Sequence, residues 1–303
     1  MGSKTPLRYP GGKQRIWPFV HEIIKLNGLC GGHYVEPYAG GAGVAIELLM
    51  RGDVSDIHLN DKCPALYSFW HSVLNETTAF CKKVLKASLS IEEWKRQREI
   101  FKRCDRKNKL ALGFATFYLN RCNRSGILTG GAIGGVAQQG KWKLDARFPR
   151  NELLNRIEAI AKRKRSIHLR NWDAERFIKQ YIVKLPKKTL VYCDPPYFRK
   201  AERLYPNSYR LEDHIRIAEV IQRHVKHPWI VSYDAAPEIL KCYEKRQYFI
   251  YKLQYNAGPV YKGTETFIFS DNLRRPHMSV MPCINKALEK LQNTKKVGQS
   301  IYA

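Results

Sequence analysis

The chain has 303 residues and 44% of them are hydrophobic, which is enough for a buried core and excludes a disordered or fibrous protein. Its 53 lysines and arginines outnumber its 27 acidic residues, so the formal net charge is +26. This excess favours a polyanionic partner such as nucleic acid, because each neutralised phosphate releases condensed counterions. The eight cysteines include no CxxC pair, which disfavours a metal site and is typical of a reducing cytoplasm. No apolar run approaches the roughly 18 residues of a membrane span, so we predict a cytoplasmic protein without membrane contact.

The amino-terminal part of the chain has the pattern of a nucleotide-binding βαβ unit. Residues 34–38 predict a short strand, residues 39–43 a tight glycine turn and residues 44–50 an apolar helix. A second predicted strand at residues 57–61 ends on the acid Asp61. Strand, glycine turn, helix, strand and acid in this order are typical of the opening of a nucleotide-binding fold.

A helical insertion is predicted between about residues 64 and 165. Ser90 and Glu93 form a capping box that predicts the start of a charged helix. A second, apolar helix is expected at residues 110–119, and residues 120–135 predict loops or a hairpin. Basic side chains in this region are expected to contact phosphates. They are Lys95, Arg96, Arg98, Lys102, Arg103, Arg106, Lys107 and Lys109.

The α/β pattern resumes after the insertion. Apolar runs predict strands at residues 166–169, 189–193 and 228–232. Two further runs, at residues 248–255 and 266–270, predict a final antiparallel pair. The alternation of strands and helices is typical of an α/β protein with a mostly parallel sheet.

These elements predict a Rossmann-like core plus a helical insertion. The core has a mostly parallel sheet with an antiparallel last strand, and it comprises residues 1–63 and 166–275. The insertion comprises residues 64–165. Residues 276–303 are predicted to be a tail with a short amphipathic helix at residues 284–291.

The segment Asp194-Pro195-Pro196-Tyr197 is the predicted catalytic loop, because it follows an apolar strand directly. The exocyclic amine of a nucleobase is a poor nucleophile, since its lone pair is delocalised into the ring. The Asp194 carboxylate and the Pro195 carbonyl can each accept one amine hydrogen, while Pro195 and Pro196 stiffen the turn. Tyr197 offers a face on which an extruded base can stack. A rigid loop with a helix-capping aspartate is the alternative.

The turn after the first strand is the predicted cofactor site. Its glycines leave room for the backbone to approach a ligand, and Asp61 lies 21 positions after Gly40, near the spacing of a ribose-binding acid. The full GxGxxG motif is absent, which agrees with S-adenosylmethionine, a cofactor without a phosphate. A tight turn without a ligand is the alternative. The predicted contact residues of the turn are Glu36, Pro37, Tyr38, Gly40, Gly41 and Gly43.

Further candidates lie outside this turn. Lys13 follows two glycines and can reach the carboxylate of a methionine moiety, and Tyr9 can pack on the cofactor. Asp173, after the strand at residues 166–169, can accept a hydrogen bond from an adenine amine. A solvated lysine and a helix N-cap are the respective alternatives.

A polar segment before the glycine-rich loop is the predicted DNA-reading region. Arginine and asparagine are the commonest readers of base edges, and glycines let a loop enter a groove. The alternative is a solvated basic loop. The predicted DNA-binding residues are Asn120, Arg121, Asn123, Arg124 and Ser125.

Taken together, these segments resemble the Dam-type family of adenine-N6 DNA methyltransferases. The resemblance rests on residues 9–13, residues 36–43, Asp61 and residues 194–197, in the order of the alpha class, and extends over roughly residues 5–272. It implies a Rossmann-like methyltransferase core that uses S-adenosylmethionine, with a helical target-recognition domain inserted between the cofactor and catalytic motifs. It also implies that Tyr9, Lys13, Asp61 and Asp194 contact the cofactor.

The resemblance implies site-specific methylation of adenine N6 in double-stranded DNA, by base flipping and direct transfer. Methylation of cytosine N4 or of RNA uses the same amine chemistry and stays open here, as does a catalytically silent DNA-binding subunit. The target sequence is not assigned. We expect a monomer or a weak dimer, with a cognate restriction enzyme or defence protein as a candidate partner.

Overall fold

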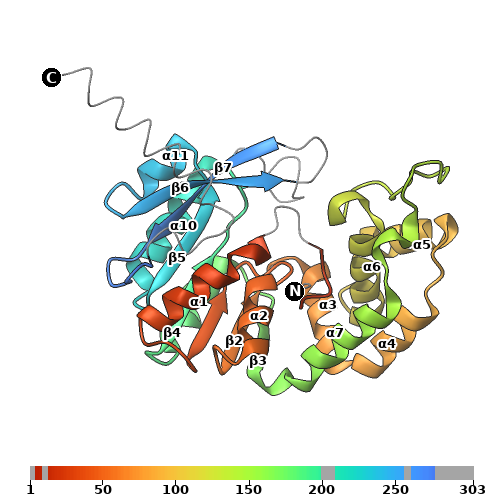
Figure 1. Ribbon diagram of the computed structural model, residues 1–303, viewed down its shortest axis with the longest axis horizontal. Coiled ribbons are helices and arrows are strands. Elements are labelled where there is room, and N and C mark those ends of the chain that lie inside the picture. The colour runs from red at the N-terminus through yellow and green to blue at the C-terminus, as the bar shows by residue number, and fades with distance from the viewer. Residues whose placement is uncertain (1–3, 9–12, 199–208, 256–260, 277–303) are drawn as a thin grey trace.

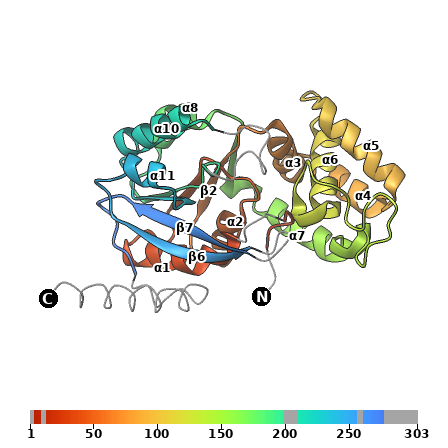
Figure 2. The same ribbon diagram turned by 90° about the horizontal axis from the view of Figure 1, so that it is seen from above.

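The computed structural model describes residues 4–8, 13–198, 209–255 and 261–276. The chain forms two lobes, one built on a β-sheet and one built of helices (Figure 1). The lobes lie side by side in both ribbon views (Figure 2). None of the helices in the described ranges is long and apolar enough to cross a membrane.

The sheet has seven strands in the order β3-β2-β1-β4-β5-β7-β6. The first five strands along the chain pair in parallel, and β7 lies antiparallel to both β5 and β6. The predicted mostly parallel α/β sheet with an antiparallel strand at its end is therefore confirmed. The strands are β1 (His33–Glu36), β2 (Asp56–Asn60), β3 (Ile167–Arg170), β4 (Thr189–Cys193), β5 (Trp229–Asp234), β6 (Tyr248–Tyr255) and β7 (Tyr261–Phe269).

Helices cover both faces of the sheet, with α1 and α2 on one side and α8, α10 and α11 on the other (Figure 2). Successive side chains of a strand point to opposite faces. Accordingly, Tyr34 packs in the core with α1 and α2, whereas its neighbour Val35 packs in the core with α8 and α10. These helices are α1 (Trp17–Leu26), α2 (Gly43–Arg51), α8 (Ala174–Gln180), α10 (Leu211–His224) and α11 (Pro237–Cys242).

The helical lobe contains α3 (Pro64–Asn75), α4 (Thr77–Lys86), α5 (Ile91–Arg103), α6 (Lys109–Cys122) and α7 (Arg150–Lys162). The N-cap half of the capping box predicted for α5 is confirmed, because the Ser90 hydroxyl accepts a hydrogen bond from the Glu93 backbone at 3.2 Å. The Glu93 carboxylate accepts hydrogen bonds from Arg96 and Gln97. Helix α6 packs on α3 so closely that a Cβ at Gly113 would lie 2.5 Å from the Ser68 carbonyl oxygen. Only glycine fits at that crossing.

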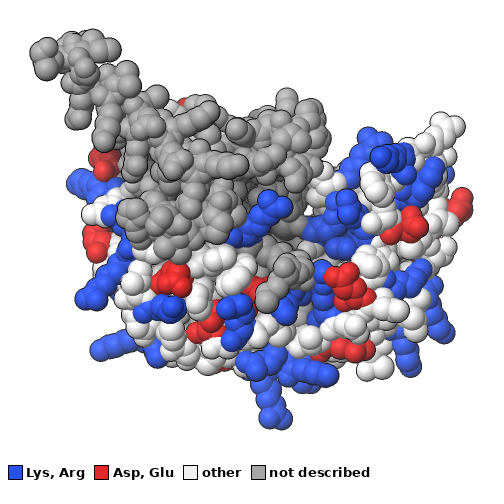
Figure 3. Space-filling view, viewed as in Figure 1, with Lys and Arg blue, Asp and Glu red and all other residues white. Residues whose placement is uncertain are grey.

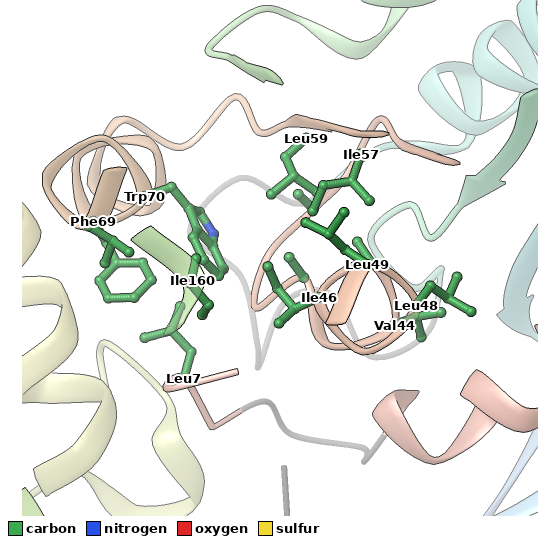
Figure 4. Packing of buried hydrophobic residues seen from close by; sticks show 14 of the residues in the cluster. Leu7, Val44, Ile46, Leu48, Leu49, Ile57, Leu59, Phe69, Trp70 and Ile160 are labelled. Atoms are coloured by element: carbon green, nitrogen blue, oxygen red, sulfur yellow. The ribbon is translucent and has the colours of Figure 1, made fainter. Parts of the chain in front are cut away.

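The two lobes share one hydrophobic core. Trp70 of α3 lies between residues of the helical lobe, such as Ile160, and residues of the sheet lobe, such as Ile46 and Leu59 (Figure 4). Leu7, from the amino-terminal segment, belongs to the same cluster. The helical lobe is therefore packed against the sheet through apolar contacts, and such contacts resist independent movement of the lobes.

Candidate active site

The strand order reverses between the neighbouring strands β1 and β4. In open α/β sheets, ligands bind beyond the carboxyl ends of the strands at such a switch point. The register pairs Val35 with Val191, so β1 and β4 end side by side. The predicted cofactor turn follows β1 and the predicted catalytic loop follows β4, so the fold brings the two motifs together.

The glycine turn is held from three directions. The Thr5 hydroxyl donates to the Gly41 carbonyl at 2.6 Å, and the Trp70 indole N–H donates to the Gly40 carbonyl at 3.0 Å. The Gly40 N–H donates to the Asp61 Oδ2 at 2.9 Å. The turn ends at Ala42, whose φ of 46° is in the left-handed region, and Gly43 begins α2. These bonds fix the turn before any ligand arrives.

Asp61 directly follows β2, as predicted, and accepts a hydrogen bond that holds the glycine turn in place. Its Oδ1 accepts a hydrogen bond from the Cys63 N–H at 2.8 Å, and its Oδ2 accepts from Gly40. Burial raises the pKa of the Asp61 carboxyl. Each carboxylate oxygen has two lone pairs, so the group keeps capacity to accept a ligand hydroxyl.

Glu36 is a buried acid at the end of β1, with 4% of its surface exposed. Its Oε1 accepts a hydrogen bond from the Ala45 N–H in the first turn of α2 at 3.2 Å. Burial raises the pKa of Glu36 to about 8, and the nearby charge of Asp194 makes a smaller contribution to this rise. Glu36 therefore holds a proton at neutral pH next to the catalytic loop.

Pro37 and Tyr38, the next residues of the turn, contact neighbouring elements of the sheet lobe. The Pro37 carbonyl accepts a hydrogen bond from the Asn60 side-chain amide at 3.0 Å. Tyr38 packs against the apolar cluster on the α10 face, and its hydroxyl lies 3.3 Å from the Tyr209 hydroxyl.

Asp194 follows β4 directly and is oriented by hydroxyl groups from two strands. The Ser232 hydroxyl on β5 donates to the Asp194 Oδ1 at 3.1 Å. The Tyr192 hydroxyl lies 2.8 Å from the Ser232 Oγ. Because serine has one proton to donate, the Tyr192 hydroxyl is the donor in that second bond.

The rest of the catalytic loop is fixed to the antiparallel end of the sheet. The Tyr197 hydroxyl donates to the Glu265 Oε1 at 2.7 Å, and the Tyr251 hydroxyl donates to the Oε2 at 3.1 Å. The Phe198 N–H donates to the Asp234 Oδ1 at 2.9 Å. Tyr197 is only 5% exposed, so in the described conformation its ring is enclosed by the protein. Its predicted stacking on a flipped base stays a prediction.

The cofactor candidates outside the glycine turn are Asp173, Tyr9 and Lys13, and of these only the side chain of Asp173 is described. Asp173 is exposed and caps α8 by accepting from the Glu175 N–H at 3.0 Å, and it pairs with Lys62 at 3.1 Å. This is the helix-cap alternative, and both contacts compete with an adenine amine. Tyr9 lies outside the described residues. Lys13 begins the short helix η1 (Lys13–Ile16), and its side chain is not among those described.

The predicted DNA-binding residues divide into two groups, which departs from our expectation. Asn120, Arg121 and Asn123 are buried, because α6 extends to Cys122 and does not end at residue 119. Arg124 is exposed and Ser125 is half-buried, in the short helix η2 (Arg124–Gly126). Only these last two lie where DNA can reach them in the described conformation.

The buried group makes scaffold contacts with the backbone. The Asn120 amide bonds both the N–H and the carbonyl of Arg8, each at 2.7 Å. The Arg121 guanidinium donates to the carbonyl of Pro6 at 3.4 Å. The Asn123 Oδ1 accepts from the Trp94 indole at 2.7 Å. In the described conformation these three residues make structural contacts, and their predicted role in reading bases stays a prediction.

Sequence reasoning missed several residues of the site. Asn60 is fully buried and links the ends of β1 and β3, through the Pro37 carbonyl and the backbone of Trp172. Glu265 is fully buried beneath Tyr197. A polar residue at an inward position of an apolar strand was the available signal for both residues. Trp70 gave no comparable signal, because a tryptophan in an apolar helix is normally a core residue.

The fold and the site together define a class of protein. An α/β sheet of this order, a glycine turn after β1, an acid after β2 and an Asp-Pro-Pro-Tyr loop after β4 are the parts of a Rossmann-like methyltransferase that acts on an amine. The family model of D12 class N6 adenine-specific DNA methyltransferases matches residues 9–257. The chain belongs to this family, so it is an enzyme that methylates the N6 amine of adenine in DNA and needs a methyl donor.

Two other comparisons add little. A structure described as rRNA methyltransferase aviRa from Streptomyces viridochromogenes is similar at 14% identity, with 87% of each chain covered and a TM-score of 0.36. That likeness is too weak to bear on the fold or the substrate. The comparison with curated proteins gave no significant match. The family match bears out adenine in DNA, against the cytosine, RNA and non-catalytic alternatives.

Proposed function

We propose that the chain transfers a methyl group from S-adenosylmethionine to adenine N6 at a short, specific site in double-stranded DNA. One observation carries this proposal. The strand order reverses between β1 and β4, and the register pairs Val35 with Val191, so the glycine turn after β1 lies beside the Asp194 loop after β4. The candidate site for the methyl donor and the candidate acceptors of the amine hydrogens therefore lie side by side at the carboxyl ends of β1 and β4.

The residues present fit S-adenosylmethionine. The turn at Gly40 and Gly41 is fixed by bonds to its carbonyls and N–H, and Asp61 keeps capacity for a ribose hydroxyl. Tyr38 provides an aromatic surface at the same turn. When bound, the cofactor supplies an electrophilic methyl group on a sulfonium. Tyr9, Lys13 and Asp173 remain candidates for its methionine and adenine ends.

The catalytic loop would act on the amine of a flipped adenine. Flipping costs on the order of a few kcal/mol, which contacts with the DNA must offset. The Asp194 carboxylate and the Pro195 carbonyl would accept hydrogen bonds from the two amine hydrogens, so the nitrogen lone pair would turn toward the methyl group. Formation of the N–C bond would break the C–S bond of the donor and leave S-adenosylhomocysteine, and the amine would release one proton to solvent. Tyr197 and Pro196 border the base. No covalent bond to the enzyme is needed, and Cys193 is a buried residue of β4 whose thiol pKa is raised by burial.

The first test is to express the protein in a host that lacks adenine methylation and to read the genomic DNA for modified bases. N6-methyladenine at one short motif would support the base, the reaction and the specificity together. A genome without methylation, with the protein present and folded, would contradict the proposal.

The Asp194 role is tested by Asp194→Ala with purified protein, labelled S-adenosylmethionine and a duplex that carries the methylated motif. We expect the turnover number to fall on the order of 100-fold or more, with cofactor and DNA affinity retained. Asp271→Ala is the matched control, because Asp271 makes a surface ion pair with Arg246 beyond the opposite edge of the sheet. Retained turnover in Asp194→Ala would refute the assigned role.

The remaining expectations accompany this proposal. Arg124 and Ser125 are the candidates for DNA contact among the five residues singled out in the sequence. A monomer or weak dimer, a cytoplasmic location and a restriction or defence partner stay predictions.

A further inference from the structure

A solvent-exposed tryptophan stands on a loop of the helical lobe. Trp142 is 60% exposed, and no large hydrophobic side chain in the described ranges is more exposed. It lies between α6 and α7, and the green loop of this region projects from the helical lobe at the upper right of Figure 1. Tryptophan is usually buried to a large extent, so an exposed ring of this size is a candidate for a contact residue.

The loop that carries Trp142 is rigidly built. Gln138, with a φ of 50°, donates from its side chain to the carbonyls of Ile133 and Gly135 at 2.7 and 2.6 Å and accepts from the Leu144 N–H at 3.1 Å. Gly134 has a φ of 84°, and a Cβ there would lie 2.6 Å from the Trp142 carbonyl oxygen. Hydrogen bonds within the loop therefore fix its backbone in a conformation that leaves the Trp142 side chain exposed.

Cations surround the exposed indole. The Lys141 Nζ lies 5.8 Å and the Arg147 Cζ 5.9 Å from the centroid of the Trp142 ring. Lys143 follows directly, and Asp145 is the acid in this stretch. Figure 3 shows lysine and arginine side chains gathered on the upper part of the helical lobe. Aromatic rings among cations are typical of surfaces that bind nucleic acid.

The loop touches the segment already expected to meet DNA. The Arg124 N–H donates to the Gly131 carbonyl at 2.9 Å, and Asn123 and Ala132 form an isolated antiparallel bridge. A Cβ at Gly135 would lie 3.9 Å from the Arg124 guanidinium. Arg124 and the Trp142 loop therefore belong to one surface.

We infer that Trp142, Lys141, Lys143 and Arg147 form a DNA-contact patch of the helical lobe. The indole ring packs on a base or deoxyribose of the duplex outside the catalytic pocket, and the three cations bind phosphates. The inference rests on the proposed function, because it takes the methylated duplex as the ligand. It adds a positioning surface that holds the DNA while Asp194 meets the target base.

The test compares Trp142→Ala, Trp142→Phe and Leu85→Ala in equilibrium binding to a labelled duplex that carries the motif methylated by the wild type. Leu85 is a matched control, because it is 56% exposed on α4 of the same lobe. Trp142→Ala should raise the dissociation constant about fivefold or more. Trp142→Phe should restore most of the affinity, and Leu85→Ala should leave it unchanged.

A charge variant gives an independent measurement. Lys141→Ala combined with Lys143→Ala should reduce the slope of log binding constant against log salt by about 2, because each phosphate contact contributes about 1. The melting temperature, cofactor affinity and turnover number at saturating DNA should not change in Trp142→Ala or in the double lysine variant, whereas KM for DNA should rise in both.

The outcomes separate this inference from the proposed function. If the wild-type protein binds S-adenosylmethionine but methylates no DNA, the proposed function itself is wrong. If the wild type methylates DNA and Trp142→Ala binds the duplex as tightly as the wild type, the inference is wrong. It is equally wrong if Trp142→Ala alters self-association and leaves DNA affinity unchanged.

Discussion

At the scale of single residues, the orientation of Asp194 depends on a chain of hydroxyl groups. Tyr192 donates to Ser232, and Ser232 donates to the Asp194 Oδ1. Tyr192 and Ser232 come from neighbouring strands and are buried, so their positions are set by the sheet. A carboxylate that must accept a hydrogen from a weakly nucleophilic amine gains from being held in one rotamer.

We predict that Ser232→Ala lowers the turnover number roughly tenfold, since it removes a hydrogen bond to a charged group, and such a bond contributes about 1.5 kcal/mol. The KM for S-adenosylmethionine should stay unchanged, because Ser232 contacts the catalytic loop and not the glycine turn. Steady-state kinetics with S-adenosylmethionine as the varied substrate measure both quantities. Ser270→Ala is the control: its hydroxyl accepts from the Trp229 N–H at the opposite edge of the sheet. An equal loss in both variants would show that Ser232 is merely structural.

At the scale of elements, the carboxyl-terminal turn of α6 joins the helical lobe to the amino-terminal segment. The Asn120 amide pairs with both backbone groups of Arg8 and also donates to the Gly126 carbonyl at 2.9 Å. Arg8 immediately precedes the segment that carries Tyr9 and Lys13. One side chain therefore ties the N-terminal motif to the short helix η2, which contains Arg124.

We predict that Asn120→Ala lowers the free energy of unfolding by roughly 1–3 kcal/mol, because three backbone groups, one of them buried and two part-buried, lose their partner. Thermal or urea unfolding without DNA measures the change. Arg124→Ala is the contrast, since Arg124 is exposed: it should unfold like the wild type but bind duplex DNA more weakly. If Asn120→Ala keeps wild-type stability and loses only DNA affinity, the original base-reading assignment is restored.

At the scale of the whole molecule, a stack of three histidines crosses β1, β2 and β3. The ring of His58 lies 5.1 Å from that of His33 and 4.5 Å from that of His168. The His58 nitrogens lie 2.8 Å from the His33 Nδ1 and 2.9 Å from the Tyr181 hydroxyl. Burial, with the charges of the two neighbouring histidines, lowers the pKa of His58 to about 3.

We predict that acid weakens the fold through His58. In the unfolded chain the pKa of His58 is about 6.5, so the unfolded state binds a proton at His58 below that pH. In the folded state His58 stays neutral until the pH falls to about 3. Stability contributed by neutral His58 is therefore present above about pH 6.5 and is lost as the pH falls, by roughly 1–2 kcal/mol near pH 5. Urea unfolding at pH 7 and pH 5 measures the loss.

The control for this prediction is His58→Gln, which cannot titrate. Glu36 acts in the opposite direction, because its raised pKa favours the folded state as the pH falls from about 8 toward 4.5. The wild type must therefore be compared with the variant at each pH. An identical pH dependence in the two proteins would remove His58 as the cause.

The sequence by itself determined the α/β class, the order of the motifs and the chemistry of the catalytic loop. Hydrophobic periodicity fixes which segments become strands, and a glycine turn or an Asp-Pro-Pro-Tyr loop at a strand end is a local feature. The expected strand at residues 189–193 coincides with β4, and the final antiparallel pair also formed, with β7 beginning before the expected residue 266. Asp61 likewise lies where its spacing placed it, bonded to Gly40.

Only the tertiary structure decided which polar side chains are supports and which face outward. Asn120, Asn123 and Arg124 are close in sequence and similar in polarity, yet two are buried scaffold residues and one is exposed. The difference arises because α6 continues to Cys122 and packs on α3 and α5, which depends on contacts distant in sequence. Asp194 is bonded by Ser232 on β5, and Tyr197 is bonded to Glu265 on β7. Their alignment is a property of strand order and register, which local sequence does not encode.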